Sequence, residues 1–125
     1  MIKAYMVEQN TKSNLFCLPY SDAGKYKIRV FTRNSENICQ VDDLNEQLGV
    51  SVNQNGSYKL MYSSIFAIFL DDSTLFVSLY DFAKKTNWLC KLDIATKKVH
   101  HTKSVVLKAS KPFNFLMKSL YDAKN

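Results

Sequence analysis

The sequence predicts an α+β fold built mainly from antiparallel β-sheet, with a short helix in mid-chain and an amphipathic helix at the C-terminus. Three observations favour this class: strand-like apolar patterns across 64–108, turn-forming residues between them, and a change to helical periodicity at 113–121. The sheet is expected to be a meander, either open and curved or closed into a barrel.

The clearest strand signals lie in the second half of the chain. Residues 64–70 are almost all apolar and end at Asp71 and Asp72. This pattern predicts a strand that is buried on both faces and lies at the centre of the sheet. Residues 75–82 are rich in β-branched and aromatic side chains and predict the next strand.

Two further segments continue the sheet. In 88–94 apolar side chains alternate with Lys91 and Asp93, which indicates a half-buried strand. After a lysine-rich turn, 99–108 predicts a fourth strand, with Val105 and Leu107 on one inner face. Together the four segments resemble one blade of a β-propeller over about 40 residues. A propeller needs several blades and no second copy is present, so the resemblance implies an antiparallel meander alone.

The first half is less regular. Asp43 and Glu46 resemble a capping box that opens a short helix, and Gly49 is placed to end it. Strands are expected at 2–7, 15–18, 26–32, 50–52 and 58–62, the last two joined by a tight turn at Asn55-Gly56.

The end of the chain has the spacing of an amphipathic helix. Pro112 suits its first turn and Ser110 is a favourable capping residue. The apolar stripe consists of Phe113, Leu116, Met117, Leu120 and Tyr121.

Composition favours one globular domain spanning 1–125, because no linker or low-complexity segment divides the chain. The longest apolar run is well short of the roughly 20 residues that cross a bilayer, and the N-terminus lacks the pattern of a secretory signal. The cysteines, Cys17, Cys39 and Cys90, are odd in number and widely spaced, which favours free thiols. We therefore expect a cytoplasmic protein with no membrane partner.

Charge is distributed unevenly along the chain. Residues 1–82 carry a net charge of −2, whereas residues 83–125 carry ten lysines and two aspartates, a net charge of +8. A field of one sign attracts acidic partners. The expected partner-binding residues are Lys84, Lys85, Lys91, Lys97, Lys98, Lys103 and Lys108. The alternative interpretation is a solvated face that keeps the protein soluble.

A second basic stripe alternates along the strand at 26–32. Its members share the face opposite Tyr26, Ile28 and Val30, and they are Lys25, Lys27, Arg29, Phe31 and Arg33. Cations beside an aromatic ring are typical of surfaces that bind single-stranded nucleic acid. An edge strand protected by positive charge has the same pattern.

Familiar catalytic motifs are absent from the sequence: there is no phosphate-binding loop, nucleophile elbow or zinc-protease motif. We expect no cofactor and no metal site, because His100 and His101 point to opposite faces of a regular strand and converge only at a bulge. A catalytic pair of Cys39 or Cys90 with either histidine is the less favoured alternative.

These observations predict a small non-enzymatic interaction protein with an acidic or nucleic-acid-handling partner. A nucleic-acid-binding module is the first alternative and a small Cys/His enzyme the second. Lysine greatly outnumbers arginine and asparagine is frequent, as in proteins of AT-rich genomes. That usage is compatible with an inhibitor from a phage or mobile element.

The C-terminal stripe gives the first testable prediction. A short helix is marginal alone, so the stripe is expected to pack on the sheet. Leu116→Ala or Leu120→Ala should then destabilise the protein by about 2–5 kcal/mol in chemical denaturation. An unchanged midpoint for both variants would show that the helix does not pack against the domain.

Overall fold

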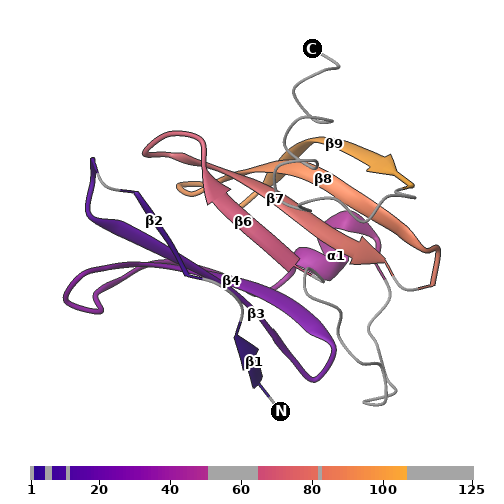
Figure 1. The fold of residues 1–125 in the computed structure, drawn as a ribbon, viewed down its shortest axis with the longest axis horizontal. Coiled ribbons are helices and arrows are strands. Elements are labelled where there is room, and N and C mark those ends of the chain that lie inside the picture. The colour runs from indigo at the N-terminus through magenta and orange to yellow at the C-terminus, as the bar shows by residue number, and fades with distance from the viewer. Residues whose placement is uncertain (1, 5–6, 11, 51–64, 82, 107–125) are drawn as a thin grey trace.

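The computed structural model describes residues 2–4, 7–10, 12–50, 65–81 and 83–106. In this part of the chain, two antiparallel sheets pack face to face, and a short helix lies beside them (Figure 1). The sheets are separate and do not close into one barrel. Mainly antiparallel architecture and a mid-chain helix are therefore confirmed, and the barrel alternative is wrong.

The helix and strands have the following bounds in the described residues: β1 (Ile2–Ala4), β2 (Glu8–Asn10), β3 (Leu15–Asp22), β4 (Lys25–Thr32), β5 (Asn37–Val41), α1 (Leu44–Leu48), β6 (Ile65–Phe69), β7 (Thr74–Asp81), β8 (Thr86–Asp93) and β9 (Val99–Val105).

The first sheet is centred on the β3–β4 hairpin. Its two-residue turn has positive φ at Ala23 (53°) and Gly24 (80°), the conformation that joins twisted strands without splaying them. β5 pairs with the free edge of β4, while β1 and β2 pair with successive parts of β3. Pro19, which has no N–H to donate, lies where β3 pairs with neither β1 nor β2.

The second sheet has the strand order β6-β7-β8-β9, which confirms the meander. The expectation that 64–70 lies at the centre of the sheet is wrong, because β6 stands at one end of this order. Its high burial has another cause: β6 lies against β2 and β3 of the first sheet. The Cys17 thiol, for example, donates to the carbonyl of Ala67 at 3.7 Å. β7 pairs with β6 on one side and β8 on the other, and it is almost completely buried.

Helix α1 ends as predicted but does not begin with a capping box. Gly49 ends it in the left-handed conformation (φ 68°), as predicted. The predicted capping box is wrong, because the Asp43 side chain caps no backbone N–H and instead accepts from Gln47 Nε2 at 2.9 Å. Asn45 ties the helix to the first sheet: its Oδ1 accepts from Tyr26 N at 2.7 Å, and its Nδ2 donates to Gly24 O at 3.5 Å.

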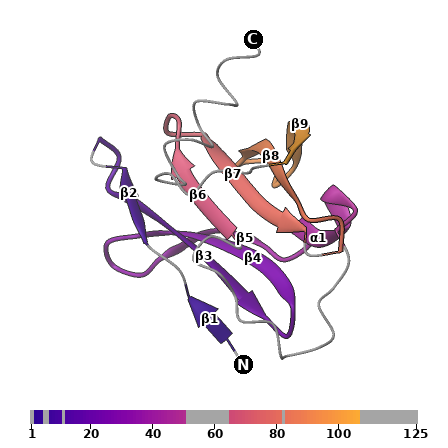
Figure 2. The same ribbon diagram turned by 45° about the vertical axis from the view of Figure 1, so that its right-hand side comes forward.

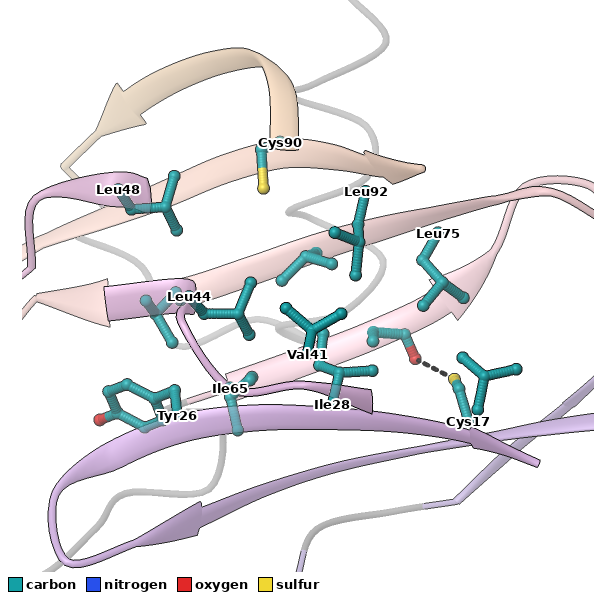
Figure 3. Packing of buried hydrophobic residues seen from close by; sticks show 14 of the residues in the cluster. Cys17, Tyr26, Ile28, Val41, Leu44, Leu48, Ile65, Leu75, Cys90 and Leu92 are labelled. Atoms are coloured by element: carbon teal, nitrogen blue, oxygen red, sulfur yellow. Dashed lines mark hydrogen bonds between the residues drawn. The ribbon is translucent and has the colours of Figure 1, made fainter. Parts of the chain in front are cut away.

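The main core fills the space between the two sheets. Figure 3 shows side chains from β3, β4 and β5 facing those from β7 and β8, with Leu44 and Leu48 of α1 closing one side. The predicted alternation in β4 and β8 is confirmed, since Tyr26, Ile28 and Val30 are buried together with Cys90 and Leu92. All three cysteines are buried and free, as predicted.

A second apolar cluster occupies the opposite face of the second sheet. It consists of Phe66, Phe76 and Leu89, with Ile68 and Val105 packed against it. β8 is therefore buried on both faces around Leu89, so its prediction as a half-buried strand is only partly correct. A bulge in the β8–β9 pairing explains why Val99 packs on the main core and Val105 on the second cluster.

Several predicted features lie outside the described residues. They are the C-terminal helix with its stripe, the strands at 51–52 and 58–62, the Asn55-Gly56 turn and Leu107. Within the described part of the chain, no helix is long and apolar enough to cross a membrane. Figure 2 shows the two layers turned by 45°. A hydrogen bond from Gln47 Nε2 to Lys97 O ties α1 to the β8–β9 turn.

The register of β8 predicts the reactivity of its thiol. Burial raises the pKa of Cys90 to about 12, so the unreactive thiol form prevails at neutral and mildly alkaline pH. A thiol reagent should therefore label native Cys90 far more slowly than the same residue in denaturant, even at pH 9. Fast native labelling, followed by peptide mass spectrometry, would contradict this register.

The hydrogen bonds of Asn45 predict a second stability effect. Asn45→Ala leaves the buried N–H of Tyr26 without its acceptor and should cost about 1–3 kcal/mol. Glu46→Ala is the matched control in the same helix, because Glu46 is exposed, and should change stability by about 0.5 kcal/mol or less. Equal midpoints for both variants would show that Asn45 does not anchor α1.

Candidate interaction surfaces

The first candidate surface is the basic hairpin, defined as residues 83–106. It contains the turn before β8, then β8, the following turn and β9. Six lysines and one carboxylate, Asp93, lie within it. Of the seven predicted partner-binding lysines it holds all except Lys108, which lies outside the described residues.

The hairpin lysines form a stripe instead of a pocket. Lys84 and Lys85 precede β8, whereas Lys97 and Lys98 follow it, so the two pairs lie at opposite ends of the strand. The 8 residues of β8 span about 26 Å at roughly 3.3 Å per residue. Lys91 and Lys103 lie between these ends on the face of the second cluster, half-buried and with intramolecular contacts.

A buried carboxylate orders the turn that carries the first lysine pair. Asp81, 2% exposed, accepts from the backbone N–H groups of Ala83 (3.0 Å) and Lys84 (3.2 Å) and from Trp88 Nε1 (3.4 Å). Lys84 Nζ lies 5.9 Å from the centre of the Trp88 ring. Lys85 has a left-handed backbone (φ 53°). The turn is thus held in one conformation while the side chains of both lysines remain exposed.

The turn with the second lysine pair is fixed against α1. Gln47 donates through Nε2 to Lys97 O and accepts at Oε1 from Val99 N, each at 2.8 Å. Asp93 Oδ1 accepts from Thr96 N at 2.9 Å. This backbone bond, aided by Thr96 Oγ1, Ala95 N–H and nearby His100, holds the pKa of Asp93 below its ordinary value. The single acidic group of the hairpin is therefore used within its own turn.

The turn lysines of the hairpin form no ion pair with another described residue. Among the described residues the structure contains one ion pair, Lys27 Nζ to Asp42 Oδ1 at 3.7 Å, and it lies in the first sheet. Lys85, Lys97 and Lys98 thus have no carboxylate partner in the described part of the chain. Their combined field extends about one Debye length, roughly 10 Å at 0.1 M salt.

The second predicted stripe lies on the outer face of the first sheet. This aromatic–basic face comprises Phe16, Leu18 and Tyr20 of β3 with Lys25, Lys27, Arg29 and Phe31 of β4, while Arg33 follows in the next turn. Phe16 and Phe31 are stacked, with ring centroids 5.6 Å apart. Phe16 and Tyr20 of this face were not predicted from the sequence, because β3 continues past the expected end at Leu18, through Pro19, as far as Asp22.

Two cations of this face, Lys27 and Arg29, already have partners inside the protein. Lys27 pairs with Asp42, and the Arg29 guanidinium donates to Ser35 O at 3.3 Å while lying 5.5 Å from the Phe31 ring centre. Tyr20 Oη accepts from Gln40 Nε2 at 2.7 Å. Two of the five predicted nucleic-acid contacts would therefore have to exchange existing interactions for phosphate contacts.

The cysteine and histidine side chains are not brought together. Cys39 and Cys90 are buried, whereas His100 and His101 are exposed, and neither thiol makes a hydrogen bond to either ring. Burial also raises the pKa of the Cys39 thiol, although Lys97 partly offsets this effect. A nucleophilic cysteine needs the opposite shift, so the geometry gives the Cys/His pair no support.

The two histidines depart from the regular strand geometry expected for them. A bulge interrupts the β8–β9 pairing between Leu89 and Lys91, and His101 has a left-handed backbone (φ 51°). The bulge that was named as the condition for the rings to converge is present, and it brings His100 Nδ1 and His101 Nδ1 to 2.8 Å.

A cleft of about 370 Å³ lies where β2 approaches the β6–β7 turn. Asp71 accepts from Ser73 N at 2.8 Å and Asp72 accepts from Asn10 Nδ2 at 3.1 Å. Hydrogen bonds from Ser73 hold the pKa of Asp71 below its ordinary value. Asp71 thus has a partner within its own turn, as expected for a turn residue, whereas Asp72 bonds to β2.

Comparison with protein-family models, curated proteins and solved structures gives no significant match to this chain.

Proposed function

We propose that the protein is a small non-enzymatic interaction domain and that its basic hairpin binds an acidic surface of a partner. One observation carries this proposal: six lysines and a single, internally used aspartate occupy the hairpin, with lysine pairs fixed at both ends of β8. A solvated face needs charge, but it does not need turns with ordered backbones.

The ordered turns bear directly on affinity. A partner that binds a mobile loop must immobilise it, which costs conformational free energy. Asp81 holds the Lys84 turn, and Gln47 holds the Lys97 turn, before any partner arrives. The conformational cost that remains on binding is that of ordering the lysine side chains. A partner whose carboxylates or phosphates are spread over about 26 Å, roughly the length of β8, would contact both lysine pairs and bind most tightly.

One concrete version is an inhibitor that occupies an acidic or nucleic-acid-handling protein of a host. On an acidic host protein, its lysines would compete with the basic ligands that this protein normally binds. The acidic surface of the partner could also be one that mimics nucleic acid. The lysine-rich, arginine-poor composition is compatible with such a role for a phage or mobile-element protein.

A nucleic-acid-binding module is the second candidate, and the aromatic–basic face favours it. The stacked Phe16 and Phe31 rings beside Arg29 could accept an unpaired base. The hairpin remains the leading site, because its turn lysines have no carboxylate partners among the described residues, whereas Lys27 already does.

Charge reversal separates these two candidates. Lys84, Lys85, Lys97 and Lys98 changed together to Glu should greatly reduce partner capture from a native lysate, because all four exposed charges change sign. Each change should alter stability by about 0.5 kcal/mol or less. Capture by the wild type should also weaken steeply with added salt.

Reversal of Lys25, Lys27, Arg29 and Arg33 is the matched control, since it changes the net charge by the same amount. The proposal predicts that this variant keeps the partner and that nuclease treatment of the lysate does not release it. Retention by the hairpin variant, or loss on nuclease treatment together with loss in the control variant, would exclude the hairpin as the site.

A further inference from the structure

The outer face of the second sheet, defined as the face turned away from the first sheet, is buried beyond what the described elements explain. Phe76 and Leu89 on this face are each 0% exposed, and so is Ser78, which pairs with Leu89. The first sheet and α1 contact the second sheet from the opposite side, where they form the main core. Side chains on an uncovered sheet face stay partly in contact with water. This burial therefore requires a further layer over the outer face.

The side chains of the outer face indicate what kind of layer covers it. The second cluster takes apolar side chains from all four strands, β6 to β9. Two polar side chains lie among them, Ser78 and Asn87, and Asn87 is 3% exposed. Ser78 Oγ and Asn87 Nδ2 have no hydrogen-bond partner among the described residues. Water or a polar layer would supply such partners, so the covering layer presents apolar side chains to the sheet.

The place where β9 ends identifies the segment that supplies this layer. Val105 packs against the second cluster, so residues 107–125 leave β9 at the outer face itself. Residues 51–64, the other long stretch outside the described residues, follow Val50 and precede Ile65, which both belong to the main core. We propose that the C-terminal segment, residues 107–125, docks on the outer face of the second sheet. The proposal is independent of the acidic partner.

The pattern and length of the C-terminal segment both suit this docking. Its sequence predicts an amphipathic helix with the apolar stripe Phe113, Leu116, Met117, Leu120 and Tyr121. A helix over 112–121 would be about 15 Å long, and the four strands of the second sheet are about 14 Å across. Residues 107–111 span up to about 17 Å when extended, which is enough to carry the helix from β9 to β6. The stripe therefore matches the second cluster in chemistry and in extent.

Nuclear Overhauser effects in the full-length wild-type protein test the docking directly. With labelled leucine methyl groups and phenylalanine rings, Leu116 and Leu120 should show contacts to the Phe76 ring and to the Leu89 methyl groups. Contacts of Leu116 and Leu120 to the first sheet, or contacts of 51–64 to Phe76 and Leu89, would overturn the proposal. A sample that mixes labelled and unlabelled chains identifies the occupant further. Contacts seen only between different chains would show that a second copy covers the face and would also overturn it.

A double-mutant cycle gives an independent test. Leu89→Ala and Leu116→Ala should each lower the denaturation midpoint, and the double variant should lose less than the sum of the two losses, because both changes remove the same contact. Val77→Ala is the matched control, since Val77 is equally buried in the neighbouring strand but faces the main core. Its loss should add to that of Leu116→Ala. Additive losses for Leu89 and Leu116 would contradict the docking, and the wild-type spectra decide the case should a variant fail to fold.

Discussion

The apolar layer between the two sheets is the constraint on which the rest of the structure depends. Cys17, Ile28 and Val30 of the first sheet meet Leu75 and Leu92 of the second, and all are fully buried. Because side chains alternate along a strand, a one-residue slip in β4 would bring Lys27 and Arg29 into this layer, and a slip in β8 would bring in Lys91. The layer therefore fixes which residues of β4 and β8 face outward, and Asn45 secures α1 against its open side.

This constraint separates two surfaces of different character. On the first sheet the outward residues interact with one another, as in the Phe16–Phe31 stack and the Lys27–Asp42 pair. On the second sheet the outward face holds a second apolar cluster, and the turn lysines project beyond both ends of β8 without carboxylate partners in the described residues. The basic hairpin thus presents its turn lysines on ordered backbone, where a partner can reach them.

Sequence periodicity predicted the β6–β9 meander and the inward face of β4, because Ile28, Val30, Cys90 and Leu92 follow the two-residue repeat without interruption. It failed where long-range packing decides the outcome: β6 is buried by the first sheet and not by a central position. β5 has no strong apolar alternation and gains its strand from the edge of β4. A bulge was the condition under which the His100 and His101 rings converge. Its presence at His101 could not be predicted, because it depends on the β8–β9 register.

The footprint of an acidic ligand on the folded protein tests the central claim most directly. Amide chemical shifts measured by nuclear magnetic resonance during titration with a short poly-glutamate peptide, and in parallel with a single-stranded oligonucleotide, report which surface each ligand contacts. The account predicts that the peptide perturbs amides at both ends of β8, around Lys84 and Lys97, more than those around Phe16 and Phe31. Shifts confined to the aromatic–basic face for both ligands would contradict it.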